Sequence, residues 1–182
     1  MVGYSNIPTP LGEIFLGFSP AGLCKVGLAG SEDAFLRWLL RVFKEPVARE
    51  ESSRSGEAAR QISAYLKGRL REFSLTLDII GTPFQKRVWA ALREIPYGKT
   101  RSYGEIAGLI RSPGASRAVG TACGRNPLPL VVPCHRVLAA GGAPGGFSCG
   151  LPIKKFLLDL EGAEVIFPAA LCKENSMPVW NK

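Results

Sequence analysis

The sequence of 182 residues contains a single histidine, His135, and two methionines. Five cysteines are scattered through it, none in a Cys-x-x-Cys pair: Cys24, Cys123, Cys134, Cys149 and Cys172. Structural zinc sites usually combine four closely spaced Cys or His ligands. The sequence therefore argues against a Cys/His zinc site, although a site assembled from several distant cysteines stays open. No metal ion or other cofactor is expected.

Long hydrophobic runs are also missing, since Pro, Gly or Lys interrupts each apolar stretch well before the ~18 residues of a membrane span. No membrane association is expected. The first residues, MVGYSNIPTPLGE, show neither the basic region nor the apolar region of a secretory signal. We therefore expect a cytoplasmic protein with reduced thiols, associated with the nucleoid if the source is prokaryotic.

Acidic residues are scarce in the middle of the chain. Residues 81–136 contain nine Lys and Arg against two Asp and Glu, whereas residues 1–80 contain ten against nine and residues 137–182 contain four of each. Most of the net charge of +8 therefore lies in one segment. A basic excess confined in this way is typical of a surface that binds a polyanion.

Three short motifs fail on spacing. Tyr97–Thr100 (YGKT) ends like a phosphate-binding loop, but Arg93 occupies the position of the first glycine. The run GGAPGG does not fit the dinucleotide-binding pattern. A papain-like protease needs a histidine far from its cysteine, and the sequence offers no second histidine.

The first 78 residues predict a small α+β domain. Alternating apolar residues indicate strands at 12–18 and 22–28, joined by a hairpin. Ser31 is placed to cap a helix that continues to Phe43. A second helix at 57–67 and a strand at 73–78 complete the predicted domain.

Residues 79–165 predict a second, mostly helical domain. Thr82 and Gln85, like Ser102 and Glu105, have the spacing of a capping box, so helices are expected from Pro83 and from about Tyr103. A third helix is expected at 115–124. The last two helices, separated by a tight break, suggest a helix-turn-helix. The apolar residues Ile153, Phe156, Leu157 and Leu160 indicate a closing helix, and residues 166–182 are expected to form an irregular tail.

The segment VVPCHRV (131–137) places Cys134 beside His135 in an apolar stretch that reads as extended. A free thiol has a pKa of about 8.5, so a nucleophilic cysteine needs a base or a positive environment. Neighbouring side chains of a strand point to opposite sides. We therefore expect His135 to act on Cys134 through a water molecule, with Glu161 orienting the imidazole ring.

Six motifs occur in a fixed order: GTPFQ with Val88-Trp89, IPYGKTRSYGEIA, SRAVGTACGRNPLP, VVPCHRV, GGFSCGL and KKFLLDLEG. Together they closely resemble the O6-alkylguanine-DNA alkyltransferases, also called methylated-DNA–protein-cysteine methyltransferases. The resemblance implies an amino-terminal RNase H-like α+β domain and a carboxy-terminal winged helix-turn-helix domain. It also implies a monomer without a cofactor. Zinc-binding members of the family use amino-terminal histidines that this sequence lacks.

The resemblance further implies direct reversal of DNA damage. The protein would bind double-stranded DNA, turn out an O6-alkylguanine, or also an O4-alkylthymine, and accept the alkyl group irreversibly on Cys134. Each molecule would act once. His135 would be the base and Glu161 its orienting acid, Tyr103 would donate a proton to the leaving guanine, and Asn126 would brace the turn before Cys134.

Further roles follow from the matched motifs. Arg117 would take the place of the extruded base in the stack. The other expected DNA contacts are Ser102, Tyr103, Ala118, Thr121, Cys123 and Arg125. The expected base pocket comprises Pro129, Val137, Phe147, Ser148 and Cys149. Phe147 and Cys149 stand where many members have other residues, so the rim of the pocket is altered.

Two alternatives belong to the class of binding proteins. An alkyltransferase-like protein would recognise the lesion without removing it, but such proteins lack the nucleophile that Cys134 provides. A sequence-specific helix-turn-helix regulator would need larger side chains on the helix at 115–124.

Overall fold

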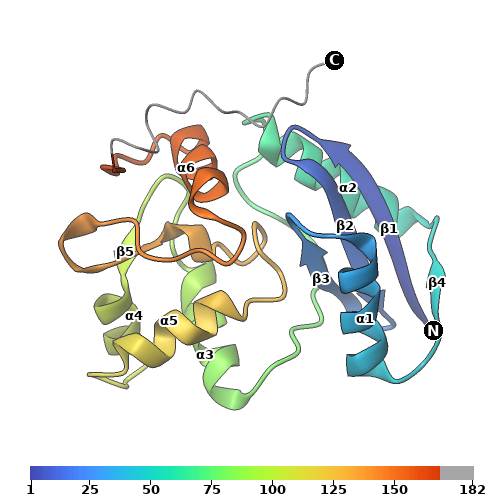
Figure 1. Ribbon diagram of the computed structural model, residues 1–182, viewed down its shortest axis with the longest axis horizontal. Coiled ribbons are helices and arrows are strands. Elements are labelled where there is room, and N and C mark those ends of the chain that lie inside the picture. Colours follow the sequence, from blue (N-terminus) through green and yellow to red (C-terminus); the bar gives the residue numbers. More distant parts are fainter. Residues whose placement is uncertain (169–182) are drawn as a thin grey trace. The chain divides into compact units, whose positions relative to one another are not determined.

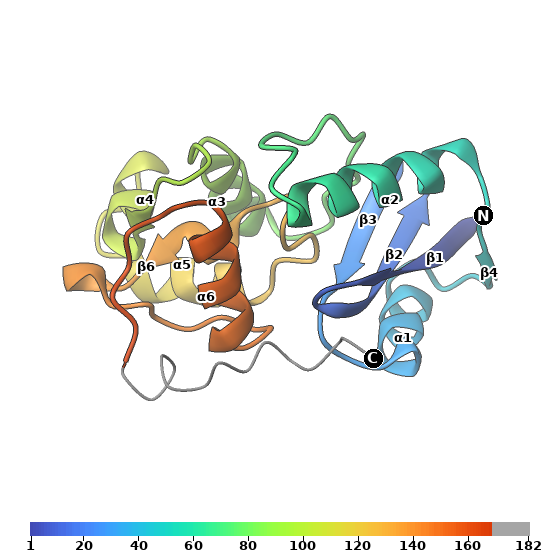
Figure 2. The same ribbon diagram turned by 90° about the horizontal axis from the view of Figure 1, so that it is seen from above.

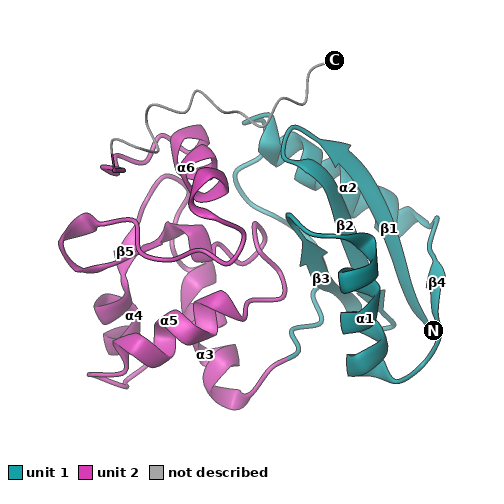
Figure 3. Ribbon diagram, viewed as in Figure 1, with its two compact units in different colours: residues 1–80 teal, residues 81–182 magenta. Residues whose placement is uncertain are grey.

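The computed structural model describes residues 1–168, so Cys172 and most of the predicted tail lie outside the described residues. The chain folds into two compact units, residues 1–80 and residues 81–182 (Figure 3). The described residues form six α-helices and a four-stranded sheet, together with a two-stranded sheet and two short 3-10 helices. Within them, no helix is long and apolar enough to cross a membrane.

Unit 1 is built on a sheet with the strand order β3-β2-β1-β4. Its strands are β1 (Val2–Thr9), β2 (Gly12–Ser19), β3 (Gly22–Gly27) and β4 (Val47–Arg49). The first three pair antiparallel in sequence order, and β4 pairs parallel with β1. The predicted strands at 12–18 and 22–28 are confirmed. The predicted strand at 73–78 is wrong, because this segment makes only an isolated bridge between Leu23 and Leu77.

Helices α1 (Glu32–Phe43) and α2 (Ser53–Leu66) cover opposite faces of this sheet (Figures 1 and 2). Most residues of β2 are therefore buried on both sides of the sheet. Phe35 and Leu39 of α1 pack into a core with Val2, Tyr4, Phe15 and Cys24. Helix α2 begins four residues before the predicted start because Ser52 caps it, reciprocally with Ser55.

Unit 2 contains α3 (Pro83–Arg93), α4 (Tyr103–Leu109), α5 (Ser116–Gly124) and α6 (Leu151–Leu160). Both predicted capping boxes are present, at the starts of α3 and α4. The buried face of α3 is formed by Val88, Trp89 and Leu92. The indole Nε1 of Trp89 donates to the Ala122 carbonyl over 2.9 Å, which fixes α3 against α5.

The fully buried face of α6 is shifted by one position along the sequence from the predicted apolar stripe. Its buried residues are Lys154, Leu157 and Leu158, followed by Glu161 just beyond the helix. These four also have the i, i+3, i+4, i+7 spacing of a helix face. The predicted closing helix is confirmed, and Ile153, Phe156 and Leu160 are half-buried beside the buried Leu157. The fully buried face is shifted because its two charged residues are buried with polar partners.

Candidate active site

The segment 131–137 is not a strand, contrary to the prediction. Cys134–Arg136 form one turn of 3-10 helix, and only Val137–Leu138 form a short strand, β6. The turn is tight because the Cys134 amide donates to the Val132 carbonyl over 2.8 Å and the Arg136 amide donates to the Pro133 carbonyl over 3.1 Å. Because Cys134 and His135 lie on a helical turn, their side chains are not directed to opposite sides as they would be on a strand.

Asn126 joins the end of α5 to the Cys134 turn. Its Nδ2 donates to the Val132 carbonyl over 2.8 Å and to Cys134 Sγ over 3.1 Å, and its Oδ1 accepts from the Leu128 amide over 3.0 Å. Asn126 and Cys134 are both buried. One amide side chain therefore shapes the loop and also contacts the sulfur.

The environment of Cys134 favours the protonated thiol. Burial raises the pKa of Cys134 to about 11, and the hydrogen bond from Asn126 acts in the opposite direction. Removing the thiol proton at neutral pH therefore needs a base close by.

His135 lies in a buried network with Glu161 and Arg136. Its Nε2 lies 2.9 Å from Glu161 Oε1, and the His135 side chain is fully buried. Arg136 donates from Nε to Glu161 Oε2 and from Nη2 to Oε1, each over 2.9 Å. This bidentate ion pair with Arg136 neutralises the Glu161 carboxylate inside the protein.

The turn after α3 completes the network. The Gly98 amide donates to Glu161 Oε2 over 3.0 Å, and Arg136 Nη1 donates to the Ile95 carbonyl over 2.5 Å. Gly98 has a φ of +73°, and a Cβ atom there would lie 2.7 Å from the Glu161 carbonyl oxygen. Glycine is therefore required for this close approach.

Burial lowers the pKa of His135, while Glu161 acts against this shift. The resting imidazole is therefore neutral. A carboxylate accepts hydrogen bonds and donates none, so the Nε2 that faces Glu161 carries the proton. Nδ1 is then the basic nitrogen, and Glu161 is placed to stabilise the imidazolium that forms when Nδ1 takes up a proton.

Tyr103 is brought to the Cys134 segment by strand pairing. Strand β5 (Arg101–Ser102) pairs parallel with β6, so that Arg101 lies opposite Val137. Tyr103 follows β5 directly, and its hydroxyl donates to the Gly146 carbonyl over 3.4 Å. Burial, with further contributions from Cys123 and Cys134, raises the pKa of Tyr103, so its hydroxyl keeps its proton at neutral pH.

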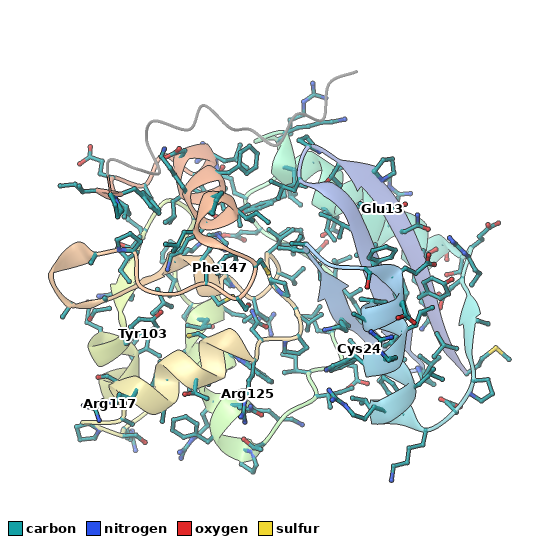
Figure 4. The ribbon with its side chains drawn as sticks, viewed as in Figure 1. Glu13, Cys24, Tyr103, Arg117, Arg125 and Phe147 are labelled. Atoms are coloured by element: carbon teal, nitrogen blue, oxygen red, sulfur yellow. The ribbon has the colours of Figure 1, made fainter. Side chains whose placement is uncertain are left out.

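Helix α5 has one buried and one exposed face. Val119, Ala122 and Cys123 are buried, whereas Arg117, Ala118 and Thr121 are exposed. Arg117 and Arg125 lie at the two ends of the helix (Figure 4). Ser102, which caps α4, is half-buried. The structure thus places Cys123 away from the exposed face of α5 that carries Arg117, Ala118 and Thr121.

The expected pocket residues come from three segments. Pro129 and Val137 are buried, and both lie within five residues of Cys134 in the sequence. Phe147, Ser148 and Cys149 lie on the loop between β6 and α6, where Ser148 is exposed and the other two are half-buried. Phe147 is marked on this loop in Figure 4.

Two residues of the site were missed as participants. In the sequence, Arg136 counts only toward the basic excess of residues 81–136, and Lys154 is assigned no role, yet both are buried. The signal was their position: Arg136 follows the Cys-His pair directly, and Lys154 shares a helix face with Leu157, Leu158 and Glu161. Among residues 1–168, no group of three or more Cys, His, Asp or Glu could hold a metal ion, and the four cysteines there are free thiols.

Comparison with known proteins agrees with this geometry. Residues 83–163 match the family model described as "6-O-methylguanine DNA methyltransferase, DNA binding domain". A methylated-DNA–protein-cysteine methyltransferase from Methanosarcina acetivorans is 47% identical over 160 residues, which cover 88% of this chain and 98% of the relative. One from Mycobacterium leprae is 41% identical over 168 residues, covering 91% and 96%.

Solved structures similar to this chain belong to the same family. The Mycobacterium tuberculosis OGT in complex with DNA is 41% identical and superposes with a TM-score of 0.77, covering 88% of this chain and 92% of that one. An O6-methylguanine-DNA methyltransferase from the archaeon Pyrococcus kodakaraensis is 26% identical with a TM-score of 0.66, covering 90% and 100%. The sequence resemblance is thereby confirmed, and the chain belongs to the methylated-DNA–protein-cysteine methyltransferases, a family of DNA-repair enzymes.

Proposed function

We propose that unit 2 repairs double-stranded DNA by moving the alkyl group of an O6-alkylguanine onto Cys134 in a single, irreversible turnover. The observation that carries the proposal is a buried thiol next to a neutral histidine that is held by a buried carboxylate. A thiol paired with a base is the arrangement of a nucleophilic cysteine, and the family relationship points to an alkyl group as what this cysteine accepts.

In the proposed reaction, the Cys134 thiol passes its proton through a water molecule to Nδ1 of His135. Glu161 stabilises the imidazolium that results, and Arg136 holds the Glu161 carboxylate in place. The thiolate attacks the alkyl carbon, so that the S–C bond forms as the bond from this carbon to guanine O6 breaks. Tyr103 donates its proton to the guanine ring as the electrons of the broken bond move into it, which makes guanine a better leaving group.

The alkylated base must leave the helical stack before its O6 atom can meet a buried sulfur, at a cost of a few kcal/mol. We propose that α5 enters the DNA with its exposed face, formed by Arg117, Ala118 and Thr121, and that Arg117 fills the gap left by the base. Arg125 and Ser102 would contact the backbone. Cys123 is left out of this interface because it is buried.

The base itself would be read by backbone carbonyls of Cys134 and Val137, under a rim formed by Phe147, Ser148 and Cys149, with Pro129 behind. O4-alkylthymine is a second proposed substrate, since it also carries an alkyl group on an exocyclic ring oxygen. We further propose that unit 2 is a winged helix-turn-helix, that unit 1 is RNase H-like, and that the protein acts as a monomer in the cytoplasm.

The test is incubation with a duplex containing one O6-methylguanine, followed by intact-protein and peptide mass measurement. We expect a gain of one methylene on the peptide that contains Cys134, in one-to-one yield, and no gain in Cys134→Ser. Tight binding to the damaged duplex without any mass change would refute alkyl transfer and favour a lesion-binding protein.

A further inference from the structure

Lys154 is an ionisable residue that the proposed reaction does not use. It lies on α6, and its side chain is fully buried. Its Nζ donates to two backbone carbonyls, those of Val137 and Pro144, each over 2.5 Å. Burial lowers the pKa of Lys154 to about 8, against the opposing effects of Cys134 and Cys123.

The two carbonyls belong to the two sides of the proposed base pocket. Val137 begins β6, directly after the Cys134 turn. Pro144 lies in the middle of the connection between β6 and α6, residues 139–150, which carries Phe147, Ser148 and Cys149. Lys154 therefore links the segment that holds the reactive sulfur to the loop that forms the rim.

This loop needs such a link because its own sequence does little to order it. It contains five glycines, at positions 141, 142, 145, 146 and 150, and four of them have positive φ. Glycine loses more conformational freedom on ordering than any other residue. Few backbone hydrogen bonds hold the loop together, among them Ala139 to Ala143 and Gly150 to Phe147.

A lysine is a costly choice for a purely structural position. An ammonium group loses its hydration when it is buried, whereas a methionine of similar length would fill the same space without that loss. What the ammonium group adds is donors that can reach two carbonyls at once. The feature that lysine provides and methionine lacks is thus the bridge between Val137 and Pro144.

We infer that Lys154 is a positioning residue for base recognition: it fixes the Val137 carbonyl and the rim loop relative to each other so that both can engage the extruded base. This inference rests on the proposed function. In it, the Val137 carbonyl accepts a hydrogen bond from the 2-amino group of guanine, and Lys154 sets the direction of that carbonyl without touching the base.

The test compares two duplexes that differ only in this amino group, one with O6-methylguanine and one with O6-methylhypoxanthine. In the wild-type protein we expect faster transfer from O6-methylguanine. In Lys154→Met, transfer from O6-methylguanine should fall by at least tenfold and transfer from O6-methylhypoxanthine by much less, so that the ratio of the rates approaches one. Lys154→Arg, which keeps the charge and the donors, should restore part of the ratio.

Lys155→Met is the matched control, because Lys155 is the neighbouring residue and its Nζ pairs with Asp159 on the surface. It should leave both rates unchanged. Hydrogen exchange gives a second readout: amides of 139–150 should exchange faster in Lys154→Met, while those of α3 and α5 stay protected.

An equal loss with both duplexes would overturn the inference, since a general weakening of the fold or of the thiolate slows both reactions alike. Unfolding of both Lys154 variants would overturn it as well, because Lys154 would then support the fold of the unit. If the wild-type protein transferred nothing from either duplex, the proposed function would fail, and the exchange of residues 139–150 would still test the bridge.

Discussion

The two units bury different kinds of polar side chain. In unit 1, all of whose residues the structure describes, the buried polar side chains are Ser19, Ser55 and Gln61, and none is charged. Among residues 81–168 of unit 2, the buried polar side chains are Asn126, His135, Arg136, Lys154 and Glu161. Buried charges are costly unless each is paired and hydrogen-bonded. Unit 2 thus buries charged groups, at a cost in free energy that unit 1 does not have. It does so around Cys134, the cysteine that we propose as the nucleophile.

The same contrast separates two buried cysteines. Cys24 in unit 1 donates to the Gly17 carbonyl, and burial raises its pKa to about 12. Cys134 in unit 2 is also buried, yet it accepts a hydrogen bond from Asn126, and burial raises its pKa only to about 11. A partner that donates to sulfur favours the thiolate, whereas a partner that accepts favours the thiol.

The largest effect, a loss of stability, is expected when the buried carboxylate of Glu161 is removed. Glu161→Gln leaves the buried Arg136 without a counter-charge, so the free energy of unfolding of unit 2 should fall by about 3–5 kcal/mol. Urea unfolding can be followed by the fluorescence of Trp89 in a background with Trp38→Phe and Trp180→Phe. The matched change in unit 1, Asp33→Asn, breaks the exposed pair with Arg37 and should have no resolvable effect.

A double variant separates stability from chemistry. Arg136→Met combined with Glu161→Leu removes both charges, so it should be less destabilised than the two single changes added together. Its transfer rate should stay low, because His135 has lost the group that orients it. Recovery of the rate together with stability would mean that the network serves the fold alone.

The next effect concerns DNA. In Arg117→Ala, transfer from duplex O6-methylguanine should slow by about tenfold for each 1.4 kcal/mol of unstacking that Arg117 offsets. Transfer from the free base O6-methylguanine should not change. Arg41→Ala, an exposed arginine of unit 1, is the control for a general loss of positive charge. Equal slowing with duplex and free base would remove the proposed role of Arg117 in extrusion.

A smaller effect is expected on the thiol. Asn126→Ala removes the hydrogen bond that lowers the pKa of Cys134, so the pKa should rise above about 11, toward that of Cys24. At pH 8 the thiolate fraction, and with it the rate of labelling by iodoacetamide, falls about tenfold for each pKa unit. Labelling of Cys24 in the same sample, measured by peptide mass, is the internal reference. A faster reaction of Cys134 would mean that access to the sulfur limits labelling.

The smallest effect is on salt dependence. Arg125→Ala should weaken binding to undamaged and damaged duplexes alike and reduce the slope of log K against log salt by about 1. Fluorescence anisotropy over a range of NaCl concentrations measures this slope. Arg41→Ala should leave it unchanged, and a smaller slope in that variant would extend the DNA-binding surface to unit 1.

Much of the helical structure could be predicted from the sequence because helix starts depend on residues three positions apart. Thr82 with Gln85 and Ser102 with Glu105 identified α3 and α4 in this way. Strand β1 was missed, although it pairs along its length with β2. β1 also pairs with β4, which is three residues long and lies about 45 positions later, so no local pattern signals this second pairing.

The residues of the candidate site could be predicted only in part, for a similar reason. Cys134, His135, Asn126 and Glu161 were found through motifs, and the structure brings them together in two hydrogen-bonded groups. The contribution of Lys154 could not be read from the sequence, because a lysine is normally assigned to the solvent side of a helix. Residues 134–136 were predicted to be extended, but they form a 3-10 turn. The hydrogen bond from Asn126 to the Val132 carbonyl shapes this loop and overrides the preference of Val131 and Val132 for a strand.

The bonds to Glu161 also bear on when each unit can fold during synthesis. The sheet of unit 1 forms mainly from strands that follow one another in the sequence, so it can assemble soon after its residues leave the ribosome. In unit 2 the carboxylate of Glu161 meets Gly98, 63 positions earlier, and Arg136, 25 positions earlier. Until residue 161 has been made, Arg136 lacks its counter-charge. We therefore expect unit 2 to finish folding last, with Cys134 accessible to solvent until then.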